Sequence, residues 1–434
     1  MDEKLQTDKI VVFDDTHLLA EEQDDVLLSI NRQLNKSRKI ILLTGAGISC
    51  NAGIPDFRSA TGLYNLIKRQ YPDISIGSGK EMFDISLFRD EMKISVFATF
   101  MEKLYASVKL AQPTTTHRFI AHLKNRNKLL RCYTQNIDGL EENLGLAISN
   151  SSFQPSTGKT TETDNSSNKN NIDVIQLHGD LNTLACTRCY HEFQWSRYLA
   201  RYFRRGELPT CPECERINNE RVQMGKRLIN NIGYLRPNIV LYGENHPSGE
   251  IITQGLNTDI NRGKPDLFII MGTSLKVDGV QRVVKQISKQ VHERKGLVIL
   301  VNKTKLSESR WNGIIDYQIC CDCDTWVKYL QGQIPDFFKS QEEVLALRQL
   351  RREASELRKL KKSEKSSIKT PPTTPTGKRN TVPTREPILN GVKRKLLTPE
   401  NSFDERSPKK FSKTTSSNKK NDTLKKKPLG IVNL

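Results

Sequence analysis

The chain has 434 residues, a formal net charge of +19 and a hydrophobic fraction of 36%. This length allows one large or two medium domains, and the low hydrophobic fraction predicts that part of the chain does not pack into a core. From Gln341 onward there are 24 Lys and Arg against 10 Asp and Glu, so +14 of the charge lies in the last quarter. This predicts a basic tail for acidic partners and argues against a core that binds nucleic acid sequence-specifically.

Cysteine usage and hydropathy limit the cellular setting. Four of the nine cysteines form two C-x-x-C pairs and no secretory leader precedes them, so we expect a reduced compartment. No apolar run approaches the ~20 residues that cross a membrane. We therefore expect an intracellular protein with no membrane partner.

Short apolar runs recur through the first 330 residues. They begin at Lys39, Lys128, Asp173, Arg236, Asp266 and Gly296, with a weaker run at Ile314. They are rich in Ile, Val and Leu and do not alternate, which is typical of parallel strands covered on both faces. Stretches of helical character such as Glu81–Val108 lie between most of them. This predicts a doubly wound, Rossmann-like α/β fold with functional loops at the carboxyl ends of the strands.

Two segments do not fit a compact fold. Ser149–Asn171 is a polar insertion of low complexity, and the chain after about Lys362 is rich in Lys, Ser, Thr and Pro, so we expect both to be disordered. Between the core and the tail, Leu347, Leu350, Ala354 and Leu357 form one apolar helix stripe. That helix either packs on the domain or, as the less favoured alternative, self-associates. The predicted regions are residues 1–34, 35–335, 336–361 and 362–434.

The stretch Leu42–Ser59 begins as a buried strand and becomes a glycine-rich loop. Its "GAG" lets backbone N–H groups approach a pyrophosphate, although Cys50 stands where a dinucleotide-binding pattern has its third glycine. A tight turn without a ligand is the alternative. Phe57 can cap a planar ring and Arg58 can pair with phosphate, so the loop is predicted to cover the reactive end of a dinucleotide.

Two further motifs follow predicted strands. In Thr134–Glu141, Asn136 and Asp138 can orient a carboxamide and a water or ribose, although either could equally cap a helix. His178 ends the next strand beside Gly179, and the pKa of histidine suits a general base near neutral pH.

The two C-x-x-C pairs are the strongest metal signal in the sequence. They predict a tetrahedral Zn²⁺ site with no open position, which is therefore structural. The ligands are Cys186, Cys189, Cys211 and Cys214. Cys320, Cys321 and Cys323 form another cluster, to which we assign no metal.

In their order along residues 35–335, the motifs "GAGIS…GIPDFRS", "TQNID", "HGD", the paired CxxC, "GTS" and a later Asn resemble the sirtuins. The wording "RPNIVLYGENHP" and "GTSLKVDGV" is most similar to the fungal nuclear histone-deacetylase branch. The resemblance implies a Rossmann-like catalytic domain with an inserted zinc ribbon at about residues 180–235. NAD⁺ and acetyl-lysine are implied to meet between the two.

The resemblance also implies residue roles. His178 is the base, with Asn136 and Asp138 as further catalytic residues. Acetyl-lysine peptide pairs as an added strand and contacts Tyr242, Gly243, Glu244 and Val277. The residues implied to bind NAD⁺ are Gly45, Ala46, Gly47, Ile48, Ser49, Asp56, Phe57, Arg58, Tyr64, Gln135, Asn136, Ile137, Asp138, Gly272, Thr273, Ser274, Asn302, Lys303, Thr304 and Cys323.

The implied activity is NAD⁺-dependent deacetylation of histone lysines, in chromatin silencing and genome maintenance in the nucleus. The acetyl oxygen attacks the ribose carbon as nicotinamide leaves, His178 helps a ribose hydroxyl attack the intermediate, and acetyl ends on ADP-ribose. NAD⁺ is consumed. Acetylated histone peptides and chromatin are the implied partners.

Three departures from the family pattern leave the substrate open. Tyr242 replaces a Phe, Gly279 replaces a Pro and so loosens the substrate strand, and the Ser149–Asn171 insertion precedes the His178 strand. One alternative is removal of longer acyl chains or mono-ADP-ribosylation. Another is a non-catalytic chromatin-binding module, against which the retained Asn136 and His178 argue.

The tail carries two further predictions. "VKRK" at Val392 and "SPKK" at Ser407 predict direction to the nucleus. Thr370, Thr374, Thr398 and Ser407 each precede a proline, so phosphorylation could recruit a ubiquitin ligase. The alternative is that such pairs arise by chance in a tail of this composition.

Overall fold

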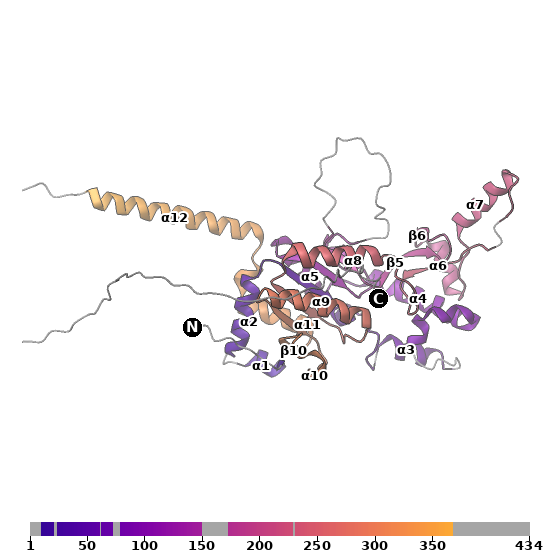
Figure 1. The fold of residues 1–434 in the computed structure, drawn as a ribbon, viewed down its shortest axis with the longest axis horizontal. Helices are drawn as coiled ribbons and strands as arrows, with labels where there is room; N and C mark the ends of the chain where they lie inside the picture. Colours follow the sequence, from indigo (N-terminus) through magenta and orange to yellow (C-terminus); the bar gives the residue numbers. More distant parts are fainter. Residues whose placement is uncertain are drawn as a thin grey trace, which may run out of the picture. The chain divides into compact units, whose positions relative to one another are not determined.

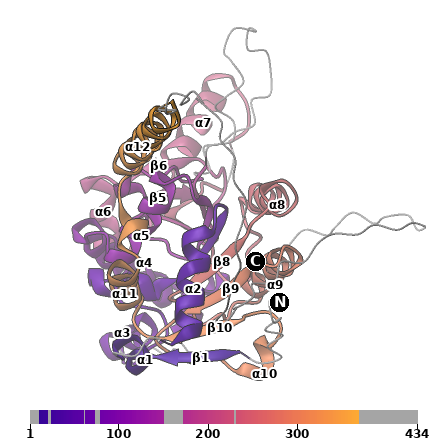
Figure 2. The same ribbon diagram turned by 90° about the vertical axis from the view of Figure 1, so that its left-hand side faces the viewer.

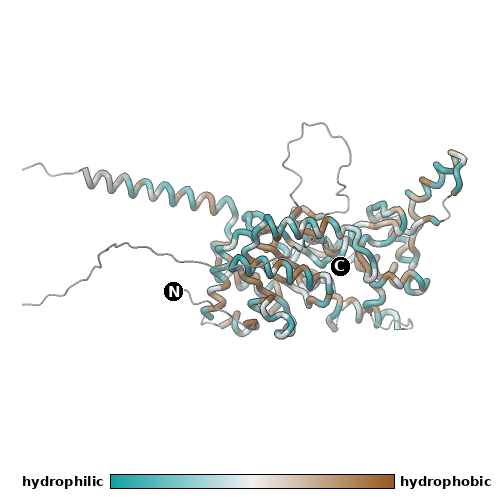
Figure 3. Tube along the Cα trace, in the orientation of Figure 1, coloured by the Kyte–Doolittle hydropathy of each residue, from teal (hydrophilic) through white to brown (hydrophobic). Residues whose placement is uncertain are grey.

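The computed structural model describes residues 10–20, 24–60, 62–72, 79–149, 172–228 and 231–367. Most of the polar insertion and all of the tail beyond Ser367 lie outside these ranges. The chain divides into two units at Arg348 and Gln349, and the account below concerns the first. In the second, the described residues belong to helix α12 (Gln341–Ser367), which is largely hydrophilic in Figure 3 and exposes Leu350 and Leu357.

The described strands form two sheets (Figure 1). They are β1 (Val11–Asp14), β2 (Ile40–Thr44), β3 (Leu129–Thr134), β4 (Val174–Gln176), β5 (Gly179–Cys186), β6 (Glu192–Gln194), β7 (Leu235–Ile239), β8 (Leu267–Met271), β9 (Leu297–Val301) and β10 (Tyr317–Cys320). The larger sheet has the order β1-β10-β9-β8-β2-β3-β4, and every neighbouring pair is parallel. This confirms the predicted doubly wound fold.

Helices cover both faces of the large sheet because alternate strand residues point to opposite sides. In β2, Ile40 and Leu42 pack with α2 (Asp25–Lys36), α5 (Thr115–Asn125) and α11 (Cys323–Gln333). Ile41 and Leu43 pack with α8 (Gly249–Thr258) and α9 (Asp278–Glu293). Figure 2 shows α2 and α11 on one side of the sheet and α8 and α9 on the other. Each buried Leu or Ile contributes about 1.5–3 kcal/mol, so these near-continuous apolar strands are the main source of the core's stability.

The helices of the first unit begin at polar caps or follow short turns. They are α1 (Asp15–Leu19), α2 (Asp25–Lys36), α3 (Leu63–Gln70), α4 (Glu91–Leu110), α5 (Thr115–Asn125), α6 (Arg197–Arg204), α7 (Pro212–Gln223), α8 (Gly249–Thr258), α9 (Asp278–Glu293), α10 (Glu308–Trp311) and α11 (Cys323–Gln333). The predicted helical start at Glu81 was too early. The Asp90 carboxylate accepts hydrogen bonds from the N–H groups of Met92 and Lys93, so α4 begins there. None of the described helices could span a bilayer.

The apolar run at Arg236 was wrongly predicted as a strand of the parallel sheet. It forms β7, which is antiparallel to β5 in the small sheet β6-β5-β7. Its residues Leu235, Pro237 and Ile239 are buried and alternate with Arg236 and Asn238, as in an antiparallel strand with one exposed face. Strand β1, parallel to β10 at the edge of the large sheet, was not anticipated either.

The two ends of the polar insertion are tied to one sheet edge. Ser149 N–H donates to Val174 O at 2.9 Å, and Asp173 N–H donates to Ala147 O at 2.8 Å. Ile148 forms an isolated parallel bridge with Val174, the first residue of β4. The chain therefore leaves and re-enters the fold at neighbouring points.

Candidate active site

The carboxyl ends of β2 and β8 meet where the strand order reverses, the usual ligand position in such sheets. Gly45 N–H donates to Met271 O and Gly47 N–H to Gly272 O, at 3.0 and 2.9 Å. A Cβ at Gly47 would lie 2.7 Å from Gly272 Cα, and Gly272 itself has φ of +63°. These glycines are thus required by the close approach of two backbones.

The following loop is shaped by Asp56. Its carboxylate accepts the N–H groups of Arg58 and Ser59 at 2.8 and 2.7 Å, which fixes a turn. Phe57 packs edge-on against Phe83, with ring centroids 5.4 Å apart, and also contacts the Tyr64 ring. Asp56 therefore builds the loop, and Phe57 and Arg58 are the side chains it presents.

Asn136 and Asp138 meet this loop through Ser49. Asn136 Nδ2 donates to Ser49 Oγ at 3.1 Å, and Ser49 Oγ donates to Asp138 Oδ2 at 2.8 Å. All three side chains are buried. Asn136 Oδ1 is also buried and receives no hydrogen bond within the described residues. A ligand amide N–H would satisfy this acceptor.

His178 is held so that one ring nitrogen is free. Its Nδ1 lies 3.0 Å from the backbone oxygen of Gln135, which can only accept, so Nδ1 carries the proton and Nε2 the lone pair. Burial lowers the pKa of His178 to about 4, and the imidazole is neutral at pH 7. Gln135 Nε2 in turn donates to Thr273 Oγ1 at 2.9 Å, linking His178 to the β8 loop.

The residues assigned to the adenosine half gather after β8 and β9. Thr273 Oγ1 accepts the N–H of Leu275, and Asn302 Nδ2 donates to the backbone and hydroxyl of Thr304. The Cys323 thiol is buried at the start of α11, and burial raises its pKa well above the usual range. Ser274 is partly exposed, whereas Lys303 and Thr304 are exposed, so side chains of these loops are accessible to a ligand.

The segment Tyr242–Glu244, predicted to contact the peptide, already forms hydrogen bonds within the fold. Tyr242 N–H donates to Phe83 O and Tyr242 O accepts from Ile85 N–H, so its backbone is already paired. Glu244 closes the turn through Arg236 at 2.6 Å and Leu241 N–H at 2.9 Å. An added strand cannot pair with Tyr242 without displacing these bonds.

The other side of the predicted peptide channel is not a strand. Val277 precedes α9 in an extended conformation, and Leu275 has φ of +49°. Gly279 lies buried in the first turn of α9. The prediction that Gly279 loosens a substrate strand was therefore wrong.

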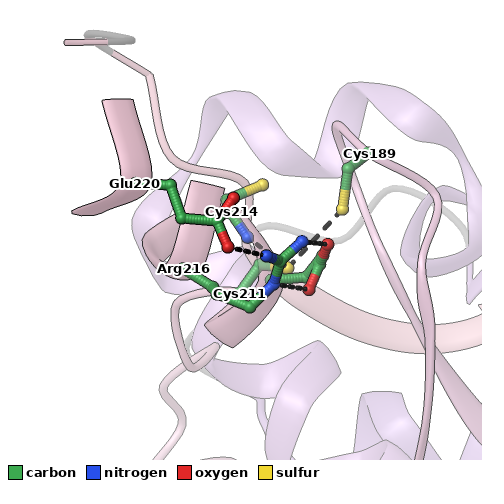
Figure 4. A network of polar contacts seen from close by, with 6 residues as sticks. Cys189, Cys211, Cys214, Arg216 and Glu220 are labelled. Carbon is green, nitrogen blue, oxygen red and sulfur yellow. Dashed lines mark hydrogen bonds and ion pairs between the residues drawn. The ribbon is translucent and has the colours of Figure 1, made fainter. Parts of the chain in front are cut away.

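Four cysteine sulfurs converge beside the small sheet, in the small domain of about residues 180–235. Figure 4 shows three of these cysteines, Cys189, Cys211 and Cys214. Cys186 Sγ is 3.7 Å from Cys214 Sγ, and Cys189 Sγ is 3.6 Å from Cys211 Sγ. A tetrahedral site with Zn–S bonds of about 2.3 Å has sulfurs about 3.8 Å apart, so the donors fit Zn²⁺. Arg216 bridges Glu213 and Glu220 on α7, the helix that also carries Cys214. The zinc site is separate from the loops around His178 and belongs to the small domain's own core.

Comparisons with known proteins all find members of one family. A family model described as "Sir2 family" matches residues 45–153 and 159–279. The chain is 59% identical over 412 residues to NAD-dependent histone deacetylase HST3 of Saccharomyces cerevisiae, covering 92% of this chain and 90% of that protein. It is 52% identical to NAD-dependent histone deacetylase HST3 of Candida albicans, covering 72% and 63%.

Among solved structures, a Sir2 complex with a deacetylated peptide and 3′-O-acetyl ADP-ribose matches with a TM-score of 0.50. The identity is 22%, and the match covers 71% of this chain and 98% of that one. This likeness concerns the fold.

Proposed function

The chain belongs to the Sir2 family, and on that premise we propose that it is an NAD⁺-dependent protein-lysine deacetylase that acts on histones. One observation carries the proposal furthest. His178 has a free, unprotonated Nε2 at the strand ends where the Ser49–Asn136–Asp138 network also lies. The two curated relatives described above are both named NAD-dependent histone deacetylases.

Each polar group then has a role in the reaction. NAD⁺ is a substrate that supplies the ribose carbon and the leaving nicotinamide. Asn136 Oδ1 accepts from an amide or hydroxyl of NAD⁺, and Asp138 holds Asn136 in place through Ser49. His178 Nε2 takes a proton from a ribose hydroxyl, because Nδ1 is engaged by Gln135 O and the Nε2 lone pair is free. Phe57 excludes water, and Arg58 offers positive charge to a phosphate.

The decisive experiment identifies the small-molecule product. Acetylated histone peptide and NAD⁺ are incubated with the enzyme, and the products are separated by mass spectrometry. We expect acetyl-ADP-ribose and free nicotinamide in equal amounts. ADP-ribose attached to protein, or no NAD⁺ consumption, would refute deacetylation.

We further propose that the enzyme acts in the nucleus and that its tail controls where and how long it persists. The supporting features are the basic "VKRK" and "SPKK" sequences and the Thr-Pro sites at Thr370, Thr374 and Thr398, all outside the described residues. A chain truncated after Leu360 should stay active but lose nuclear enrichment. The triple Thr→Ala variant should persist longer in dividing cells if a ubiquitin ligase binds the phosphorylated tail, and an unchanged half-life would exclude this.

A further inference from the structure

Two buried polar residues that cluster with Asp138, namely Glu141 and His117, have no role in the reaction described above. Asp138, Glu141 and His117 each direct one polar atom into a cluster whose atoms lie within 4.8 Å of one another. His117 and Glu141 are fully buried, and Asp138 is 5% exposed. Unpartnered buried polar groups are rare, so this cluster requires an explanation.

The hydrogen bonds divide the cluster into one satisfied and two unsatisfied members. Asp138 accepts from Ser49 Oγ and, at 3.1 Å, from Leu140 N–H, as an ionised carboxylate does. Neither oxygen of Glu141 receives a hydrogen bond from the described residues, and His117 Nε2 has no partner there either. An ionised carboxylate in Glu141's position would be stabilised only by the Thr134 hydroxyl and its own backbone N–H, which lower its pKa less than burial and Asp138 raise it.

His117 is fixed by the helix that carries it. The backbone N–H of Thr114, the cap of α5, donates to His117 Nδ1 at 3.2 Å. The Thr114 hydroxyl, which donates to Ile48 O at 3.0 Å, lies 2.8 Å from the same nitrogen, so both tautomers of His117 fit these contacts. In one tautomer Nε2 is a donor to a carboxylate, and in the other it accepts from a neutral carboxylic acid such as Glu141.

We propose that Glu141 is a positioning residue that remains a neutral carboxylic acid at physiological pH. With the neutral His117, it leaves Asp138 as the single negative charge of the cluster. Asp138 then keeps its hydrogen bond from Ser49, and Ser49 keeps the Asn136 amide in place. The inference rests on the proposed function, because it assigns Asn136 and Asp138 to NAD⁺.

The surroundings favour this protonation state. Burial, and then the charge of Asp138, raise the pKa of Glu141 to about 8. The other titratable groups facing it are His117 on α5 and Cys132 on β3, whose thiol pKa burial raises well above the usual range. Arg118 and Asp324 act on His117 with opposite sign. No cation in this set pairs with Glu141.

The proposal predicts that kcat/KM for NAD⁺ falls at alkaline pH. As pH rises through about 8, Glu141 ionises beside Asp138 and the two buried charges repel. The proton leaves to solvent, Asp138 is pushed away from Ser49, and Asn136 loses its orientation. Above that pH, kcat/KM for NAD⁺ should fall about tenfold per pH unit.

The test compares Glu141→Ala with Glu141→Gln, which mimics the neutral acid. We expect E141A to lower kcat/KM for NAD⁺ about tenfold, which is about 1.4 kcal/mol. E141Q should restore most of it and shift the alkaline loss upward. Glu102→Gln is the matched control, since Glu102 is buried too but pairs with Arg204 on α6. Wild-type and E141Q profiles that superimpose would overturn the proposal.

A second measurement does not depend on activity. Infrared spectra of the wild-type protein at about pH 7 should contain a buried protonated-carboxyl band that disappears in E141Q and persists in E102Q. A spectrum without that band, or a second tightly bound metal ion released by E141Q, would contradict a neutral Glu141. Absence of acetyl-ADP-ribose in the wild type would instead count against the deacetylase function and leave the infrared result valid.

Discussion

Arg58 Nη2 donates a hydrogen bond to the Tyr242 hydroxyl across 3.1 Å. The two residues come from opposite parts of the site, the loop after β2 and the segment after β7. Lys80 Nζ lies 4.4 Å from the centroid of the Tyr242 ring, so a second cation holds the same side chain. A phenylalanine in this position could stack but could not join the loops.

Tyr242→Phe removes this link without changing the shape of the ring. A hydrogen bond to a charged donor contributes about 1.5–3 kcal/mol, much of which water recovers at an exposed site. We expect KM for NAD⁺ to rise about threefold with little change in kcat, measured with saturating acetylated peptide. Tyr198→Phe on α6, which breaks only an exposed Tyr198–Tyr202 contact, is the control. Equal KM values for Y242F and the control would show that the link is not used.

His178→Ala should abolish turnover while NAD⁺ still binds. The imidazole acts on a ribose hydroxyl after the cosubstrate is in place, and loss of a general base costs about 10²–10⁴ in rate. Calorimetry should give NAD⁺ affinity within a few-fold of wild type. His17→Ala, at an exposed helix cap, should have no effect on either quantity. Normal turnover by H178A would remove the base assignment.

Cys214→Ser should destroy the small domain's metal site. Structural zinc contributes about 10 kcal/mol or more to such modules, and three ligands with a hydroxyl cannot replace four thiolates. Elemental analysis should find about one zinc per wild-type chain and a C214S protein that is insoluble or metal-free. Cys320→Ser keeps the four ligands and should retain both metal and solubility. A soluble, active, zinc-free protein would contradict this.

His292→Gln tests a pH-dependent contribution to stability. Asp316 accepts from His292 at 3.0 Å and raises the pKa of that imidazole. Because the pKa of His292 is raised in the folded state, its contact with Asp316 stabilises the fold fully below the unfolded-state pKa of about 6.5. This contribution is lost as pH rises through the folded-state pKa. H292Q should therefore lower the free energy of unfolding by about 1 kcal/mol at about pH 6 and by less at about pH 8. Chemical denaturation at both pH values measures it, and a larger effect at the higher pH would reverse the sign.

Most of the parallel sheet and the candidate loops could be predicted from sequence. Strands buried on both faces are continuous apolar runs, as in β2 and β8, and such runs are visible without a structure. Functional loops follow strand ends, which is why the positions around Gly45, Asn136 and His178 could be named in advance. The C-x-x-C spacing of the two cysteine pairs is by itself a sequence signal for the zinc ligands.

The remainder depends on contacts between distant residues. β7 reads LRPNI and alternates between buried and half-buried residues, unlike the continuously buried β2 and β8, but its partner β5 and its direction appear only in the fold. His117 lies in an ordinary amphipathic helix, and no local pattern links it to Glu141 across the fold. Likewise, the backbone of Tyr242 is occupied by Phe83 and Ile85, which precede it by more than 150 residues. No local motif encodes such pairings.

The chain segments Ala147–Ser149 and Asp173–Val174 are hydrogen-bonded to each other beside β4, so the insertion between them is a suitable site for engineering. Because both ends are closed by backbone hydrogen bonds, doubling the number of residues between them costs only about 0.6 kcal/mol of closure entropy. A fluorescent domain or an affinity tag could be grafted there without altering the register of β3 and β4. The same property gives evolution a place where length can drift while the neighbouring strand that leads to His178 keeps its position.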